Sequence, residues 1–280
     1  MRPAQRDDPF LFIIGAMKSG TTSLYEQLRR HPQLCTCRQD EIGFFSNDEQ
    51  YARGLDWYLA HYDADPAQHR AMFDRSCVYA KVPACPAAAP RMAECLGDCR
   101  FVYLVRDPVD RVESHVNYSI YHGWSKPDAD PLGNGFVDPS RYAMQLSRFT
   151  EHFPKERVLV LLFDDLKREP QAIFDRVCAF AGLDPIPLPT AAEAKNVTRQ
   201  RTFADTVDGW RVSQRFAGLL PQGLRKLIRE RLFERVGVDK KVVLSFEQRA
   251  EIRRRIDDDT TQFVAEWGVE PRTFASVEPS

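Results

Sequence analysis

A glycine-rich segment at residues 15–22, Gly-Ala-Met-Lys-Ser-Gly-Thr-Thr, has the residue types of a loop that holds a phosphate or sulfate group. It follows an apolar run at 10–14 that is typical of a buried strand. Gly15 and Gly20 allow a tight turn in which successive backbone N–H groups point at one anion, and the positive end of the following helix strengthens that attraction. The segment predicts an anion-binding turn between a strand and a helix.

The position of the lysine separates this loop from that of nucleotide triphosphatases. In those proteins a Lys and a Ser or Thr follow the second glycine, and the lysine reaches the β- and γ-phosphates beside Mg²⁺. Here Thr21 and Thr22 follow Gly20, while Lys18 lies within the loop. A lysine at that place suits metal-free transfer from a short anhydride. An ordinary glycine turn is the alternative, and the combination of Lys18 with three hydroxyl side chains argues against it.

A second group of residues has the composition of a phosphate grip. The apolar stretch 101–105 ends in Arg106, Asp107 can cap a helix begun by Pro108, and Ser114 then lies two turns along that helix. A guanidinium and a hydroxyl group together bind a phosphate dianion well. The alternative is that Arg106 pairs with an acidic residue at the start of the helix.

Both groups resemble segments of the sulfotransferases that use 3′-phosphoadenosine-5′-phosphosulfate (PAPS). The loop of that family, Lys-x-Gly-Thr-Thr-x-Leu, matches residues 18–24, and its 3′-phosphate signature matches Arg106 and the serine eight residues beyond it. The resemblance implies PAPS as cofactor, 3′,5′-adenosine diphosphate as product, no metal, and in-line transfer of a sulfuryl group to a hydroxyl acceptor. It implies cofactor contacts from Lys18, Ser19, Gly20, Thr21, Thr22, Ser23, Arg106 and Ser114, with weaker support for Arg199 and Arg201.

The segment 40–46 is similar to the Lys-Glu-x-x-Phe-Phe segment of the branch related to heparan-sulfate sulfotransferases, in which the glutamate is the general base. Sulfuryl transfer requires the acceptor to lose a proton and the leaving phosphate to be neutralised. The resemblance assigns the first task to Glu41 and the second to Lys18. Asp40 and Gly43 depart from the family pattern, which leaves the acceptor and the base open, and a solvated loop carboxylate is the alternative for Glu41.

Further residues are candidates for the acceptor side of the site. Lys81, in a segment that resembles the family's Glu-Lys-Thr-Pro, could steer an anionic acceptor, pair with a carboxylate such as Glu41, or be an ordinary surface lysine. The segment 123–139 is rich in proline and glycine and has no helical or strand period, so we predict an acceptor-binding lid, with a disordered connector as the alternative. The remaining candidates are Trp124 and Phe136 on that lid, His115 as an acceptor contact, and His115 or His122 as alternative bases.

The order of apolar segments predicts the fold class. Strand patterns alternate with helix patterns, which indicates a P-loop-like three-layer α/β/α fold with a central, mostly parallel sheet of about five strands and a site at their carboxyl ends. A capping box at 46–49, a helix from Pro170 to Gly182, and a long helix capped by Ser245 are expected. Arg249, Arg253, Arg254 and Arg255 suggest a solvated face of that last helix. The predicted strands are 10–14, 33–37, 77–82, 100–105 and 157–163.

The whole chain has the size and composition of one enzyme domain. Its 280 residues, 43% of them hydrophobic, predict a single domain over 1–280, with an α/β core at 9–200 and a helical part at 201–280. A net charge of −1 gives no global attraction to nucleic acid or to an anionic membrane. No apolar stretch approaches the ~18–20 residues of a membrane span, and the first residues lack a signal-peptide core, so we expect a cytoplasmic protein.

Two other function classes stay open at this point. A P-loop kinase or nucleotide hydrolase is one, because Asp164 and Asp165 after a strand could mimic a Mg²⁺ site. A non-catalytic nucleotide-binding protein is the other. The seven cysteines lack the paired spacing of a zinc site and suggest reduced packing residues. The sequence identifies neither the acceptor, which could be a small molecule or a glycan, nor the oligomeric state.

Overall fold

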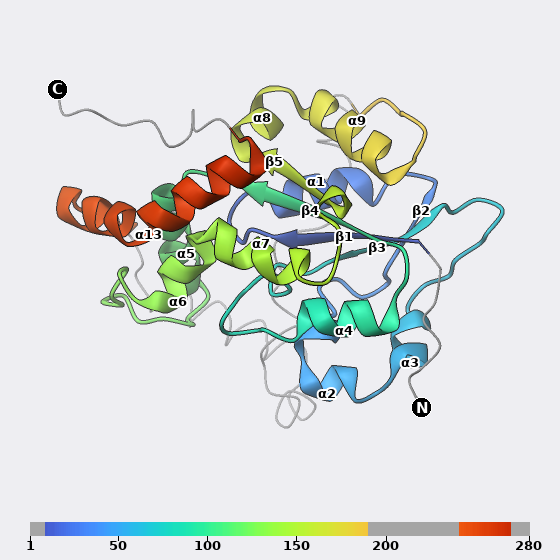
Figure 1. The fold of residues 1–280 in the computed structure, drawn as a ribbon, viewed down its shortest axis with the longest axis horizontal. Helices are drawn as coiled ribbons and strands as arrows, with labels where there is room; N and C mark the ends of the chain where they lie inside the picture. Colours follow the sequence, from blue (N-terminus) through green and yellow to red (C-terminus); the bar gives the residue numbers. More distant parts are fainter. Residues whose placement is uncertain (1–8, 190–240, 270–280) are drawn as a thin grey trace, which may run out of the picture. The chain divides into compact units, whose positions relative to one another are not determined.

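Five parallel strands form the centre of the computed structural model, which describes residues 9–189 and 241–269 (Figure 1). Arg199, Arg201 and the predicted boundary at residue 200 lie outside these ranges. The strand order is β2-β3-β1-β4-β5, and each neighbouring pair is parallel. The predicted α/β class with a five-stranded parallel sheet is therefore confirmed. The strands are β1 (Phe10–Gly15), β2 (Leu34–Thr36), β3 (Ala71–Arg75), β4 (Cys99–Val105) and β5 (Val158–Leu162).

One predicted strand is wrong. Residues 77–82 form turns, and the strand is β3, which ends two residues before them and carries Asp74 and Arg75 in a buried position. A charged pair in an apolar strand is permitted here because both side chains have partners. The Asp74 carboxylate accepts hydrogen bonds from the hydroxyl groups of Tyr58 and Tyr79, at 2.9 Å each.

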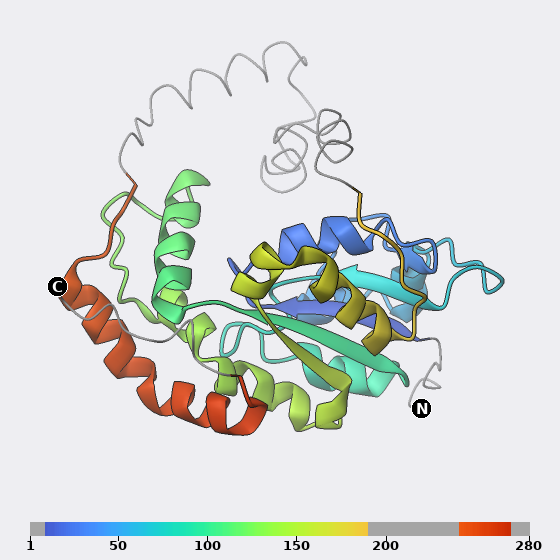
Figure 2. The ribbon, with the colours of Figure 1, turned by 90° about the horizontal axis from the view of Figure 1, so that it is seen from above.

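Helices cover both faces of the sheet (Figures 1 and 2). Alternate residues of a strand point to opposite faces, so Phe10 and Phe12 face the aromatic side of the core while Leu11 and Ile13 face the other. On the aromatic side lie the short helices α2 (Asp48–Tyr51) and α3 (Leu55–Leu59), followed by α4 (Ala88–Cys95) and α7 (Tyr142–Thr150). The opposite face is covered by α1 (Thr21–Leu28), α8 (Phe163–Arg168) and α9 (Pro170–Ala181).

The remaining elements lie beyond the carboxyl ends of the strands or within connections. They are α5 (Pro108–Tyr121), α6 (Asn134–Val137), α13 (Phe246–Trp267) and three 3₁₀ turns at Phe44–Ser46, Asp138–Ser140 and Lys155–Arg157. Helix α13 runs beside α7, and its Asp259 carboxylate accepts hydrogen bonds from the backbone N–H groups of Ala143 and Met144 in the first turn of α7. Because residues up to Ile186 and from Val242 onward form one compact unit, α13 packs as part of the sheet domain.

Helix caps test the predictions made from side-chain types. Ser245 and Gln248 form the expected capping box at the start of α13, and Gly182 ends α9 in the left-handed conformation. The capping box predicted at 46–49 is wrong, since Asn47 caps α2 by accepting from the Gln50 N–H. The absence of helical structure predicted for 123–139 is also wrong in part, because α6 lies within that segment.

Candidate functional site

The two predicted phosphate motifs follow neighbouring strands. β1 and β4 are adjacent and parallel, so their carboxyl ends meet at one edge of the sheet. From β1 the chain goes to β2 and β3 on one side, and it returns to β4 and β5 on the other. Open α/β sheets bind ligands at such a switch point, in the crevice outside the strand ends. The loop that contains Lys18 leaves β1, Arg106 leaves β4, and Arg75 is the last residue of β3.

Close packing fixes the loop after β1. Gly20 caps helix α1 with a φ of 86°, in the left-handed region. A Cβ at Gly20 would lie 2.6 Å from the Phe163 ring at the end of β5, and a Cβ at Gly15 would lie 2.5 Å from the Tyr103 ring of β4. Ser19, within the loop, is fully buried. Both glycines are therefore required by the close approach of the loop to the rings of Tyr103 and Phe163.

Lys18 extends over an aromatic ring. Its Nζ lies 3.8 Å from the centroid of the Tyr118 ring on α5, and none of the described residues forms an ion pair with it. Burial lowers the pKa of Lys18, and the positive charge of Arg106 lowers it further. Because burial and a neighbouring positive charge disfavour the charged form of Lys18, an anion that binds beside it would stabilise that form.

Arg106 is oriented by its neighbours but only loosely paired. The Tyr142 hydroxyl donates to its backbone carbonyl at 2.9 Å, and its guanidinium lies over the Phe163 ring at 5.2 Å. The distance between its Nη2 and the Asp110 Oδ2 is 4.0 Å, the outer limit of an ion pair. Ser114 is half-buried on the same helix. The same phenylalanine thus packs against Gly20 and Arg106, which brings the two predicted motifs together.

Glu41 is oriented by an arginine that the sequence reasoning missed. Its Oε1 lies 3.2 Å from Arg75 Nη1, and the same Nη1 donates to the Thr22 hydroxyl at 2.9 Å. Arg75 is buried whereas the Glu41 side chain is 50% exposed. Burial lowers the pKa of Arg75, but the charge of Glu41 and further acidic neighbours outweigh it and raise that pKa overall. An Asp-Arg pair directly after the apolar residues 71–73 was the signal that could have identified this residue.

Cys77, which is half-buried, contacts the start of helix α1. The Cys77 thiol and the Thr21 hydroxyl are hydrogen-bonded at 3.2 Å. Burial raises the pKa of Cys77 to about 11; the charge of Glu41 also raises it, and the charge of Lys18 lowers it. The charges of Glu41 and Lys18, which come from different loops, thus act on the same thiol.

The residues predicted for the acceptor side occupy different surroundings. Burial, with the charges of Arg111, Lys81 and Lys18, lowers the pKa of His115 to about 3. Phe136 packs edge-on against the His115 ring at 5.0 Å, and its carbonyl accepts a hydrogen bond from Arg111. This contact holds the segment 123–139 against α5.

The other two candidates differ in exposure: Lys81 is half-buried and Trp124 is exposed. The chain beside Lys81 is held by the buried Gln145, which bonds both the N–H and the carbonyl of Val82, and Glu41 pairs with Arg75 rather than with Lys81. Trp124 is 41% exposed, and its ring packs against Tyr118, the ring that supports Lys18. The roles of these residues toward an acceptor stay predictions.

The chain belongs to the sulfotransferase family. A model of the sulfotransferase domain matches residues 8–263, which is most of the chain. A sulfotransferase from Alicyclobacillus acidocaldarius has the same fold, with a TM-score of 0.67 at 21% identity over 96% of this chain and 99% of that one. The family and the topology agree with the placement of the two phosphate motifs at neighbouring strand ends.

Two relatives illustrate the range of the family. The membrane-associated sulfotransferase kil1 of Dictyostelium discoideum is 33% identical over 126 residues, which is 44% of this chain and 25% of that protein. The human bifunctional heparan sulfate N-deacetylase/N-sulfotransferase 2 is 25% identical over 225 residues, which is 72% of this chain and 24% of that protein. The chain thus spans about a quarter of the length of these relatives. Within 9–189 and 241–269, no helix has the length and apolar character needed to cross a membrane.

Proposed function

We propose that this protein transfers a sulfuryl group from PAPS to a hydroxyl acceptor and releases 3′,5′-adenosine diphosphate. The observation that carries the proposal is the pair of cations, Lys18 and Arg106, which follow the neighbouring strands β1 and β4 and lack a close carboxylate partner among the described residues. Two phosphate groups on one ligand would satisfy both cations. Membership of the sulfotransferase family supports the same reaction.

The residues present fit the two ends of this cofactor. The backbone of the loop 15–20 and the amino end of α1 would hold the 5′-phosphosulfate, since the loop leads directly into α1 and the amino end of a helix favours an anion. Arg106 and Ser114 would hold the 3′-phosphate. When bound, PAPS supplies an activated sulfuryl group on a phosphate leaving group. The remaining predicted contacts near the loop are Ser19, Thr21, Thr22 and Ser23.

Different side chains would accept the proton of the acceptor and neutralise the charge on the leaving phosphate. Lys18 would neutralise the negative charge that collects on the leaving phosphate. Glu41 would accept the proton of the acceptor hydroxyl, and Arg75 would fix the direction of that carboxylate. The histidines are less suited to this task, because burial lowers the pKa of both His115 and His122 and so disfavours their protonated forms.

The contacts of Asp164 and Asp165 do not favour the alternative of a P-loop kinase or nucleotide hydrolase. Asp164 forms an ion pair with Lys167 at 2.6 Å, and Asp165 forms one with Arg168 at 2.6 Å. Both carboxylates are thus engaged within helix α8 and carry no sign of a Mg²⁺ site. Glu41→Gln separates an enzyme from a non-catalytic binder, because the variant should bind the nucleotide normally and lose turnover.

A cytoplasmic location and a small-molecule or glycan hydroxyl acceptor are part of the same proposal. All seven cysteines are free thiols, which agrees with a reducing compartment. The exposed Trp124 beside the ring that supports Lys18 agrees with an acceptor entering from that side.

Ligand-dependent thermal stability tests the proposal directly. We expect 3′,5′-adenosine diphosphate to raise the melting temperature by several degrees, since a ligand at ~100 times its Kd adds about 2.7 kcal/mol. Ordinary ADP and Mg²⁺-ATP should have smaller effects. Arg106→Met should remove the preference for the 3′-phosphorylated nucleotide. A larger shift with Mg²⁺-ATP would refute the proposed cofactor.

A further inference from the structure

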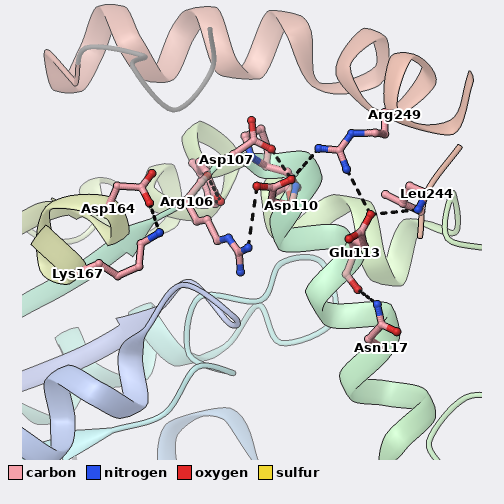
Figure 3. A network of polar contacts seen from close by, with 12 residues as sticks. Arg106, Asp107, Asp110, Glu113, Asn117, Asp164, Lys167, Leu244 and Arg249 are labelled. Atoms are coloured by element: carbon pink, nitrogen blue, oxygen red, sulfur yellow. Dashed lines mark hydrogen bonds and ion pairs between the residues drawn. The ribbon is translucent and has the colours of Figure 1, made fainter. Parts of the chain in front are cut away.

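Helix α13 reaches into the predicted 3′-phosphate site through one arginine (Figure 3). Arg249, in the first turn of α13, donates from Nη2 to the Asp110 Oδ1 at 2.7 Å and from Nη1 to the Glu113 Oε2 at 3.2 Å. Both acids belong to α5, the helix that carries Ser114. The expectation that Arg249 lies on a solvated face is therefore wrong, as it is for Arg255, which donates to the Leu132 carbonyl at 2.7 Å.

Asp110 lies between two guanidinium groups. Its Oδ1 is bound by Arg249 at 2.7 Å, whereas its Oδ2 is 4.0 Å from Nη2 of Arg106 (Figure 3). Arg106 precedes α5 and Asp110 lies in the first turn of that helix, so the two opposite charges are close enough to pair. The closer ion pair between Asp110 and Arg249 thus competes with an ion pair between Asp110 and Arg106.

The segment before α13 is held to the same face of α5. Asn117 forms two hydrogen bonds with the backbone of Val242, at 2.9 Å and 2.8 Å, and Glu113 Oε2 accepts from the Leu244 N–H at 3.0 Å. Glu113 and Asn117 lie on either side of Ser114 in the sequence. Figure 3 shows the contacts of Glu113 with Leu244 and Arg249 along one side of α5, so Ser114 and the contacts to the 242–249 segment share one helix.

We propose that Arg249 is a positioning residue for the 3′-phosphate: it holds and neutralises Asp110, so that Arg106 remains available to the ligand. The inference rests on the proposed function, in which Arg106 binds that phosphate. Without Arg249, Asp110 would be free to pair with Arg106, and two uncompensated carboxylates would repel a phosphate dianion. Arg249 acts through Asp110 and does not need to touch the nucleotide.

The test compares the affinities for 3′,5′-adenosine diphosphate and for 5′-AMP, measured by calorimetry. Their ratio isolates the contribution of the 3′-phosphate. We expect Arg249→Met to reduce the ratio by about tenfold, equivalent to ~1.4 kcal/mol. Arg249→Lys, which keeps the charge, should recover part of the loss. Arg254→Met is the matched control, because Arg254 lies on the same helix and pairs with Glu251 alone among the described residues.

A double-mutant cycle shows whether Arg249 acts on the 3′-phosphate site through Asp110. In an Asp110→Asn background, the further change Arg249→Met should reduce the ratio less than it does in the wild type, because the carboxylate that competes for Arg106 is gone and only Glu113 is left uncompensated. Additive losses in the double variant would overturn the proposal, as would an equal loss of affinity for both nucleotides in Arg249→Met alone. A failure of the proposed function is distinguishable, since Arg106→Met would then leave the affinity ratio of the wild type unchanged.

Discussion

Replacement of Gly20 by alanine tests whether close packing against the end of β5 fixes the phosphate loop. The new Cβ would lie 2.6 Å and 2.8 Å from Cδ2 and Cε2 of Phe163, and 3.3 Å from Cδ2 of Leu166. These distances are too short for carbon atoms, so the ring or the loop must move. Movement of the ring would also displace Arg106, whose guanidinium lies over it. We therefore expect losses of both stability and nucleotide affinity.

The expected loss of stability has two parts. Gly20 has a φ of 86° and a ψ of 10°, and a residue with a Cβ pays roughly 1–2 kcal/mol in this left-handed region. Overpacking against the ring adds about 1–3 kcal/mol. The sum is about 2–5 kcal/mol, which at roughly 2–4 °C per kcal/mol lowers the melting temperature by about 4–20 °C.

Gly268 supplies the matched control for the backbone term. It ends α13 with a φ of 62° and a ψ of 23°, and no atom lies within 4 Å of the position of its Cβ. In urea and thermal unfolding, Gly268→Ala should lose only the stability that the left-handed backbone costs a residue with a Cβ. Equal losses in Gly20→Ala and Gly268→Ala would refute the packing argument. Phe163→Leu, combined with Gly20→Ala, should recover part of the steric loss if the argument holds.

Three further changes have defined outcomes. Arg75→Met should lower kcat about tenfold or more with a smaller change in nucleotide Kd, because Glu41 loses its orienting partner; an unchanged kcat in steady-state kinetics would exclude this role. Ser245→Ala should cost ~1 kcal/mol in urea unfolding, since it removes the side-chain cap of α13. The pKa of His115 is lowered to about 3 in the fold, so between pH 6.5 and 3 the unfolded chain binds a proton that the folded chain does not, and stability falls as the pH falls. Between pH 7 and pH 5 the wild type should therefore lose about 2 kcal/mol more than His115→Gln.

The fold and the places of the two proposed phosphate-binding segments in it could be predicted because local signals agreed with one another. The apolar run at 10–14, the glycines of the loop and the helix start at Pro108 each have a local cause, and each lies where the pattern places it. Parallel topology then brings the ends of β1 and β4 together without any further information from the sequence.

The strand β3 and Arg75 could not be predicted in the same way. Their sequence, Ala-Met-Phe-Asp-Arg, places two charges in a buried strand, and a pattern of apolar residues gives no weight to such a segment. The partners of Asp74 come from Tyr58 and Tyr79, and those of Arg75 come from Thr22 and Glu41, all of which are distant in the chain or outside the strand. The compensation is tertiary, so it becomes visible only in the folded structure.

Ion pairing separates the tasks of the three cations at the strand ends. Lys18, Arg106 and Arg75 follow or end three adjacent strands, so parallel topology alone brings three positive charges to one edge of the sheet. Arg75 is paired with Glu41 at 3.2 Å, which suits the orientation of a base. Lys18 lies over a ring, and Arg106 is 4.0 Å from Asp110 while Arg249 holds that carboxylate from the other side. Among the residues that the structure describes, the two cations proposed to bind phosphate are thus those without a close carboxylate. At Arg106 this arrangement depends on a helix more than a hundred residues further along the chain.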